Sequence, residues 1–208
     1  MSHKDFLSAD DRQKIIDCVT ETEKTTSGEI VPLISSASSD YPRAQASGAL
    51  VLGLLVAIPT CLALGRQDIW TGFTLFLVAY SLAYAALAML PCLRRLFMLK
   101  REMDDEVEEG AMTSFFIHGL NNTRDKTGIL IYISVYEKRV RILADSGINA
   151  KVDPGTWDAV VAKLSQGIKE GRQVDAICEA VKRCGALVSE KFPIKSDDTN
   201  ELPNLIVE

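Results

Sequence analysis

Two long stretches without a charged side chain limit what this chain can fold into. Asp, Glu, Lys and Arg make up 25% of the residues, yet none falls at residues 44–65 and none at residues 69–93. An α-helix rises about 1.5 Å per residue, so roughly 20 uncharged residues can cross a hydrocarbon core about 30 Å thick. We therefore predict a transmembrane hairpin over residues 44–97, with spans at about residues 45–64 and 69–91.

The connection between the two stretches is too short to do more than reverse the chain. It consists of Gly65, Arg66, Gln67 and Asp68. The alternative, two core helices of a large soluble protein, is disfavoured because the remaining chain is too short to wrap helices that are apolar on every face. Pro59 lies inside the first span, where we expect a kink and not a break.

Basic residues near the spans predict the orientation of the hairpin. Arg43 precedes the first span, whereas the tip has only Arg66, offset by Asp68. The second span is followed by four basic residues, Arg94, Arg95, Lys100 and Arg101. Since Lys and Arg are enriched on the cytoplasmic side, both ends should be cytoplasmic. We predict a multi-pass protein of the cell inner membrane with its soluble domain in the cytoplasm.

The segments on either side of the hairpin should form one soluble domain, since two spans return the chain to its starting side. Residues 1–40 and 100–192 are assigned to this discontinuous domain, and residues 193–208 to a C-terminal tail. Ser8 and Asp11 form an N-cap signature for a helix over residues 8–25. Residues 29–35 are typical of a strand, in which Pro32 predicts an edge position or a bulge.

The segment after the hairpin alternates between helical and strand patterns. Apolar residues recur every four positions from Met103 to Phe115, which predicts a helix ending near residue 118. Residues 128–135 are almost uniformly aliphatic, which indicates a central strand buried on both faces. A turn at Glu137 and Lys138 leads to a half-exposed strand, and two amphipathic helices follow. The predicted fold is α/β, with a small central β-sheet flanked by helices and an inserted two-helix transmembrane hairpin.

Three short segments carry a resemblance to a known family: Thr26-Ser-Gly-Glu-Ile-Val, the strand and hairpin starting at Gly128, and Asp145-Ser-Gly-Ile. Together they resemble the TPM domain, named after a thylakoid lumen protein, a photosystem II repair factor and a nematode receptor modulator. The chain is similar to bacterial members with membrane segments inside the domain. The resemblance implies a compact sheet covered by helices. It also implies divalent-cation binding and phosphatase activity, as proposed for some members, or assembly of membrane complexes, as for others.

Four acidic residues are candidate ligands for Ca²⁺ or Mg²⁺, because they fall at predicted strand ends and loops: Glu29, Asp125, Asp145 and Asp153. These cations take several oxygen ligands, mostly carboxylates. Each residue also has an ordinary explanation, since Asp153 is placed to cap the next helix and Asp125 sits in a polar loop. No residue is assigned a catalytic role.

Other polar groups have structural explanations. Six acids open the predicted helix after the hairpin, where the helix dipole and solvent favour them: Glu102, Asp104, Asp105, Glu106, Glu108 and Glu109. His118 ends that helix and is interpreted as a polar cap. The five cysteines show no metal-binding spacing.

Two functions remain open from the sequence. The first is a membrane-anchored module for the interaction, assembly or maintenance of membrane protein complexes, with the lipid bilayer and other membrane proteins as partners. The second is a divalent-metal-dependent phosphatase displayed at the membrane. A transporter is disfavoured because the spans hold no ionisable group of the kind that lines ion paths. The net charge of −5 gives no reason to expect nucleic-acid binding, and a homo-oligomer is left open.

Overall fold

The computed structural model describes residues 6–65, 68–194 and 199–208, so Arg66 of the predicted tip lies outside the described residues. The chain divides into two compact units. One comprises Met1–Ser39 and Asp104–Glu208, and the other is Asp40–Met103. The first unit holds the sheet, and the second holds two long apolar helices.

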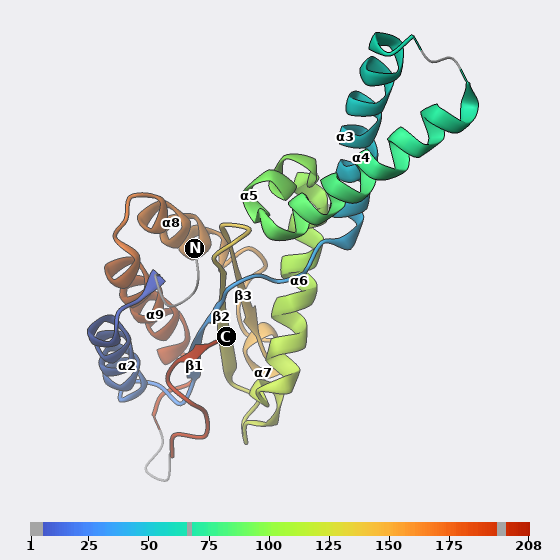
Figure 1. Ribbon diagram of the computed structural model, residues 1–208. Coiled ribbons are helices and arrows are strands. Elements are labelled where there is room, and N and C mark those ends of the chain that lie inside the picture. The colour runs from blue at the N-terminus through green and yellow to red at the C-terminus, as the bar shows by residue number, and fades with distance from the viewer. Residues whose placement is uncertain (1–5, 66–67, 195–198) are drawn as a thin grey trace. The chain divides into compact units, whose positions relative to one another are not determined.

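The first unit is built on a four-stranded sheet with the order β3-β2-β1-β4. Its strands are β1 (Glu29–Ser35), β2 (Gly128–Ser134), β3 (Arg139–Ala144) and β4 (Ile206–Val207). β1 pairs in parallel with both β2 and β4, and β3 pairs antiparallel with β2. Helices flank this sheet, which confirms the predicted α/β class (Figure 1).

The link between β1 and β2 contains the whole second unit. Parallel neighbours need a crossover connection, usually a helix, and α6 (Lys100–Ile117) fills that role here. In the chain order, the two apolar helices lie between the end of β1 and the start of α6. The hairpin is therefore an insertion into a β-α-β crossover, which leaves the pairing of β1 with β2 intact from Glu29↔Gly128 to Ser35↔Ser134.

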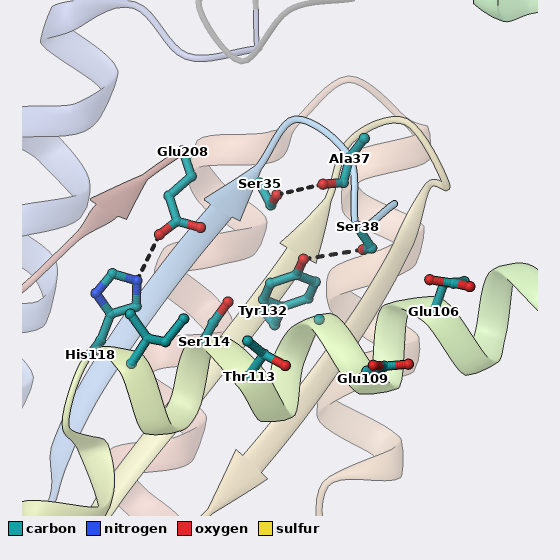
Figure 2. Close-up of a pocket in the computed structure, with 12 residues that line it drawn as sticks. Ser35, Ala37, Ser38, Glu106, Glu109, Thr113, Ser114, His118, Tyr132 and Glu208 are labelled. Carbon is teal, nitrogen blue, oxygen red and sulfur yellow. Dashed lines mark hydrogen bonds and ion pairs between the residues drawn. The ribbon is translucent and has the colours of Figure 1, made fainter. Parts of the chain in front are cut away.

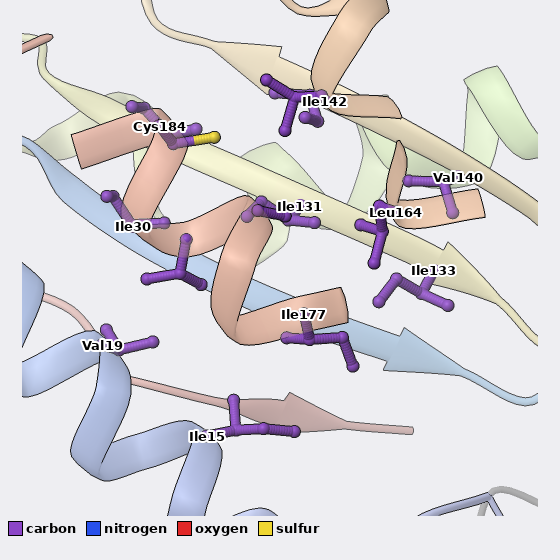
Figure 3. Close-up of a cluster of buried hydrophobic side chains, with 14 of the residues drawn as sticks. Ile15, Val19, Ile30, Ile131, Ile133, Val140, Ile142, Leu164, Ile177 and Cys184 are labelled. Atoms are coloured by element: carbon purple, nitrogen blue, oxygen red, sulfur yellow. The ribbon is translucent and has the colours of Figure 1, made fainter. Parts of the chain in front are cut away.

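Helices cover both faces of the sheet. α2 (Ala9–Glu23), α8 (Asp158–Lys169) and α9 (Gln173–Ser189) pack on one face, where Ile30, Ile131 and Ile177 belong to one buried cluster (Figure 3). α6 covers the other face through Val107, Ala111 and Phe115 (Figure 1). Two short elements complete the unit, η2 (Leu120–Asn122) and α7 (Ser146–Asn149).

Local sequence signals set several of these elements. The side chain of Ser8 accepts a hydrogen bond from the Asp11 backbone, and the Asp11 carboxylate accepts one from the Ser8 N–H, so the predicted cap of α2 is confirmed. All seven residues of β2 are buried, as expected for a strand covered on both faces. β3 alternates between buried and half-buried residues, and Lys138 takes a left-handed conformation with φ of 56° in the turn before it.

The bulge expected at Pro32 is wrong, because the register of β1 with β2 is continuous. The alternative, an edge position, applies locally, because β4 follows β1 in the strand order but pairs only with Leu33 and Ile34. Residues alternate in direction along a strand. Ile34 accepts a hydrogen bond from Glu208 in the tail, so the Pro32 nitrogen points to the same side. Pairing with β4 starts only at Leu33, so the N–H that Pro32 lacks is not needed. The strand β4 was not predicted.

The second unit is a helical hairpin. α3 (Pro42–Ala63) continues through Pro59 without a break. Asp68 precedes α4 (Ile69–Met89) and caps it by accepting the Thr71 N–H at 2.9 Å. The buried face of α3 consists almost entirely of small residues, so the backbones can approach closely. A Cβ added to Gly53 would lie 3.2 Å from the Tyr80 backbone. α5 (Pro91–Arg94) and η1 (Arg95–Phe97) follow.

Candidate functional site

The outer surface of the hairpin is its main functional feature. Both α3 and α4 are long and apolar enough to span a membrane. Their large apolar side chains are exposed, for example Leu62 at 74%, Ile69 at 79% and Leu82 at 67%. Core helices bury such side chains, and soluble surfaces rarely expose contiguous apolar patches above a few hundred Å². The surface fits lipid better than water.

The two ends of the hairpin are fixed to each other. The Arg94 guanidinium donates to the Asp40 carbonyl at 2.8 Å, which ties the residue before α3 to the segment after α4. Between the helices, the Gln45 amide donates to the Tyr84 carbonyl at 3.2 Å. A polar side chain in this setting is satisfied by the partner helix, as in packed membrane helices.

Three of the four acids predicted as metal ligands lie at the same end of the sheet, where β1 and β2 start and β3 ends. Glu29 starts β1, Asp125 precedes β2 and Asp145 follows β3. β3 runs antiparallel to β2, so its end returns to the start of β2, and the Asp145 N–H donates to the Gly128 carbonyl at 2.9 Å. Asp153 is exposed in the loop before α8. The sheet topology thus gathers three of the acids at one end, and the fourth lies in a separate loop.

Asp145 is the most constrained of these acids. Its Oδ1 atom accepts from the Ser146 N–H at 2.6 Å and from the Ser146 hydroxyl at 3.1 Å. Its Oδ2 atom is buried and has no hydrogen-bond partner among the described residues. Nearby, Gly147 packs so tightly that an added Cβ would lie 2.7 Å from the Asp125 carbonyl oxygen. A buried carboxylate oxygen without a partner is costly, which fits a cation ligand.

Glu29 and Asp125 have protein partners. Glu29 accepts from the Glu201 N–H at 3.3 Å, and Asp125 lies 3.7 Å from the Arg124 guanidinium. Within the described parts of the chain, no three His, Cys, Asp or Glu side chains group in a way that could hold a metal ion. The four-residue metal site therefore stays a prediction, with Asp145 its best-supported member.

A polar pocket of about 290 Å³ opens on the α6 side of the sheet. Its walls come from α6, from the end of β1 and the residues after it, and from Tyr132 and Glu208 (Figure 2). His118 Nε2 lies 2.7 Å from a carboxylate oxygen of Glu208. The Tyr132 hydroxyl lies 3.1 Å from the Ser38 hydroxyl. The pocket is lined mainly by hydroxyl and carboxylate groups.

These pocket residues were not predicted as a site. Ser114 lies on α6 and His118 follows its last residue, four positions later, so their proximity could have been predicted from the sequence. Glu208 could not, because it reaches the pocket only through the pairing of β4 with β1. Figure 2 shows the Nδ1 side of the His118 ring turned away from Ser114, so the two do not form a nucleophile–base pair.

The fold and the hairpin together define the class of protein: an α/β domain whose β1–β2 crossover contains two helices able to span a membrane. The family model of the TPM domain matches residues 95–187. The predicted resemblance to the TPM domain is therefore confirmed over this part of the chain.

A solved structure supports the fold. The chain is similar to the NMR structure of the BA42 protein from the psychrophilic bacterium Bizionia argentinensis, with a TM-score of 0.61 and 22% sequence identity. The match covers 98% of this chain and 96% of that chain. No curated protein matches the sequence. At this identity the likeness concerns the fold alone.

Proposed function

We propose that this protein is a membrane-anchored TPM domain in which the hairpin spans the bilayer twice and holds the α/β unit at the membrane surface. There the domain acts as an interaction or assembly module for other membrane proteins. The observation that carries the proposal is the apolar outer surface of α3 and α4, on which residues such as Leu55 and Leu62 are 64% and 74% exposed. The match of residues 95–187 to the family model of the TPM domain supports the domain assignment.

The proposed location is the cell inner membrane, with both ends of the chain in the cytoplasm. The basic residues Arg43, Arg94 and Arg95 flank the helices on the side where the chain enters and leaves the hairpin. The bond from Arg94 to the Asp40 carbonyl keeps these flanks together, as expected when both face the same compartment.

Membrane extraction and protease protection test the anchor. The full chain, with a tag at each end, is expected to stay with membranes after alkaline carbonate treatment and to leave them in detergent. In inverted inner-membrane vesicles both tags are expected to be cleaved by added protease, whereas in spheroplasts both are protected. Release by carbonate, or opposite protection of the two tags, would refute the architecture.

Crosslinking in intact membranes, followed by detergent purification, tests the assembly role. We expect recovery of one or more membrane proteins in a fixed ratio to the bait. The control is α3–α4 fused to an unrelated soluble domain, which should not recover the same proteins. If the control recovers them equally well, the TPM domain has no part in the interaction.

Divalent-cation binding at Asp145 is a second candidate, favoured by the buried Oδ2 atom without a partner. Asp145, together with oxygens of the Asp125 turn, would hold the ion. A bound Ca²⁺ or Mg²⁺ would supply the electrostatic polarisation of a phosphoryl oxygen that a phosphatase needs. Calorimetric titration of the detergent-solubilised chain should give saturable binding that Asp145→Ala removes. Asp175→Ala, which deletes an exposed acid from α9, serves as the control.

A further inference from the structure

The pocket between α6 and the end of β1 carries a concentrated negative charge. Glu106, Glu109 and Glu208 line it, and no lysine or arginine is among the lining residues described. Glu208 is paired with His118, whereas Glu106 and Glu109 make no ion pair with any described residue. An acidic helix face is by itself an ordinary solvated surface, so the charge alone does not define a site.

A second observation points independently to a ligand. Ser114 lines the pocket from α6 and is only 8% exposed. Its hydroxyl makes no hydrogen bond to any described residue, although helical serines commonly bond to a backbone carbonyl of the preceding turn. In Figure 2 this hydroxyl projects from α6 into the space in front of the sheet, between Glu208 and Tyr132. The side chain is mostly buried and its hydroxyl faces the pocket, so this hydroxyl is available to a bound ligand.

The Tyr132 hydroxyl, on β2, lines the wall of the pocket opposite α6. Tyr132 is 2% exposed, and its hydroxyl meets that of Ser38 at 3.1 Å. Gly110 makes room for it, since an added Cβ there would lie 2.8 Å from the Tyr132 oxygen. The pocket is thus lined by fixed oxygen atoms on the sheet and by carboxylates on α6.

The arrangement of the pocket carboxylates favours an organic cation over a metal ion. A metal ion needs its ligand oxygens to converge within about 2.0–2.6 Å of one point. No such group of three acidic or histidine side chains occurs among the described residues, although three carboxylates share this pocket. An organic cation with separated N–H groups can reach carboxylates that are too far apart for one ion. The pocket volume of about 290 Å³ lies at the small end of ligand pockets.

We propose that this pocket binds a small aliphatic amine with two ammonium groups. One ammonium lies between Glu106 and Glu109, and the other donates to Glu208 and to the Ser114 hydroxyl. The proposal goes beyond the anchoring function and does not depend on it, because all lining residues belong to the unit that contains the sheet.

Calorimetry with 1,4-diaminobutane tests the proposal. The full chain is used in a zwitterionic detergent, so that lipid phosphates do not compete for the amine. We expect saturable binding of one equivalent. The double variant Glu106→Gln/Glu109→Gln should weaken it by at least about tenfold, since one ammonium group then loses both of its charged acceptors. Ser114→Ala should weaken it by several-fold.

A matched control and two competitors make the result decisive. Glu108→Gln removes the same charge from the same helix at an exposed position outside the pocket and should change the affinity less than twofold. Butylamine, with one ammonium group, should bind at least tenfold more weakly. The proposal is overturned by non-saturable binding, by an equal loss in Glu108→Gln, or by Mg²⁺ displacing the diamine at similar concentrations.

Discussion

Val78→Lys is the substitution that best separates lipid from water around the hairpin. Val78 lies near the middle of α4 and is 54% exposed. At the centre of a membrane helix, valine contributes about −0.3 to −0.6 kcal/mol to insertion and lysine costs about 2.5–3.5 kcal/mol. The change therefore disfavours insertion by about 3–4 kcal/mol, which is a factor of at least 10² in the equilibrium. Nine residues separate Val78 from the start of α4, roughly 14 Å, so the ammonium group cannot reach the interface.

In water, the same substitution would be almost neutral. Exposed positions away from special features usually tolerate changes within about 0.5 kcal/mol. Met112→Lys on α6 provides the matched control, because Met112 is 51% exposed and belongs to the sheet-containing unit. Val78→Leu controls for the change of side chain alone.

The assay measures the fraction of chain that resists alkaline carbonate extraction after expression in cells. We expect Val78→Lys to reduce this fraction strongly, and Met112→Lys and Val78→Leu to leave it unchanged. If Val78→Lys instead yields a detergent-free, monodisperse protein with an unaltered melting temperature, α4 faces water and the membrane proposal fails.

Three further outcomes follow from contacts in the sheet-containing unit. Glu137→Ala should destabilise it by about 2–4 kcal/mol in urea unfolding, because Glu137 is fully buried and accepts the Ser38 N–H at 3.0 Å; Glu137→Gln, which keeps an acceptor, should cost less. Gly167→Val should cost at least about 1–3 kcal/mol, because even a Cβ there would lie 2.4 Å from a side-chain carbon of α9. The Cys178 thiol lowers the pKa of Cys18 to about 7, so alkylation of Cys18, followed by mass spectrometry, should rise with pH and reach half its maximum near pH 7. Burial raises the pKa of Cys184 to about 12, so the Cys184 thiol should stay unlabelled in the folded chain.

The elements predicted correctly are those whose signals are local. The cap of α2, the aliphatic run of β2 and the alternation in β3 are each formed by residues close together in the sequence, and each identified its element. The exposed faces of α3 and α4 follow from the absence of charge. In each case the sequence pattern extends over the same few residues or turns as the structural element that it predicts.

The features that were missed depend on pairing between distant segments. β4 is two residues long and carries no alternation, so only its register with Leu33 and Ile34 reveals it. The polar pocket was missed for the same reason, since Glu208 arrives with β4. Glu137 was predicted only as a turn residue, because nothing in its neighbours indicates that it accepts a hydrogen bond from the segment after β1.

The position of the hairpin inside the β1–β2 crossover sets an order of events during synthesis. β1 emerges from the ribosome first, but both strands that flank it are made later: β2 after the hairpin, and β4 at residues 206–207. The seven residues of β1, all buried in the folded protein, therefore stay unpaired until both apolar helices have left the ribosome. If the hairpin spans the membrane as proposed, a failed insertion also delays completion of the sheet, and β1 stays accessible to chaperones and proteases for longer.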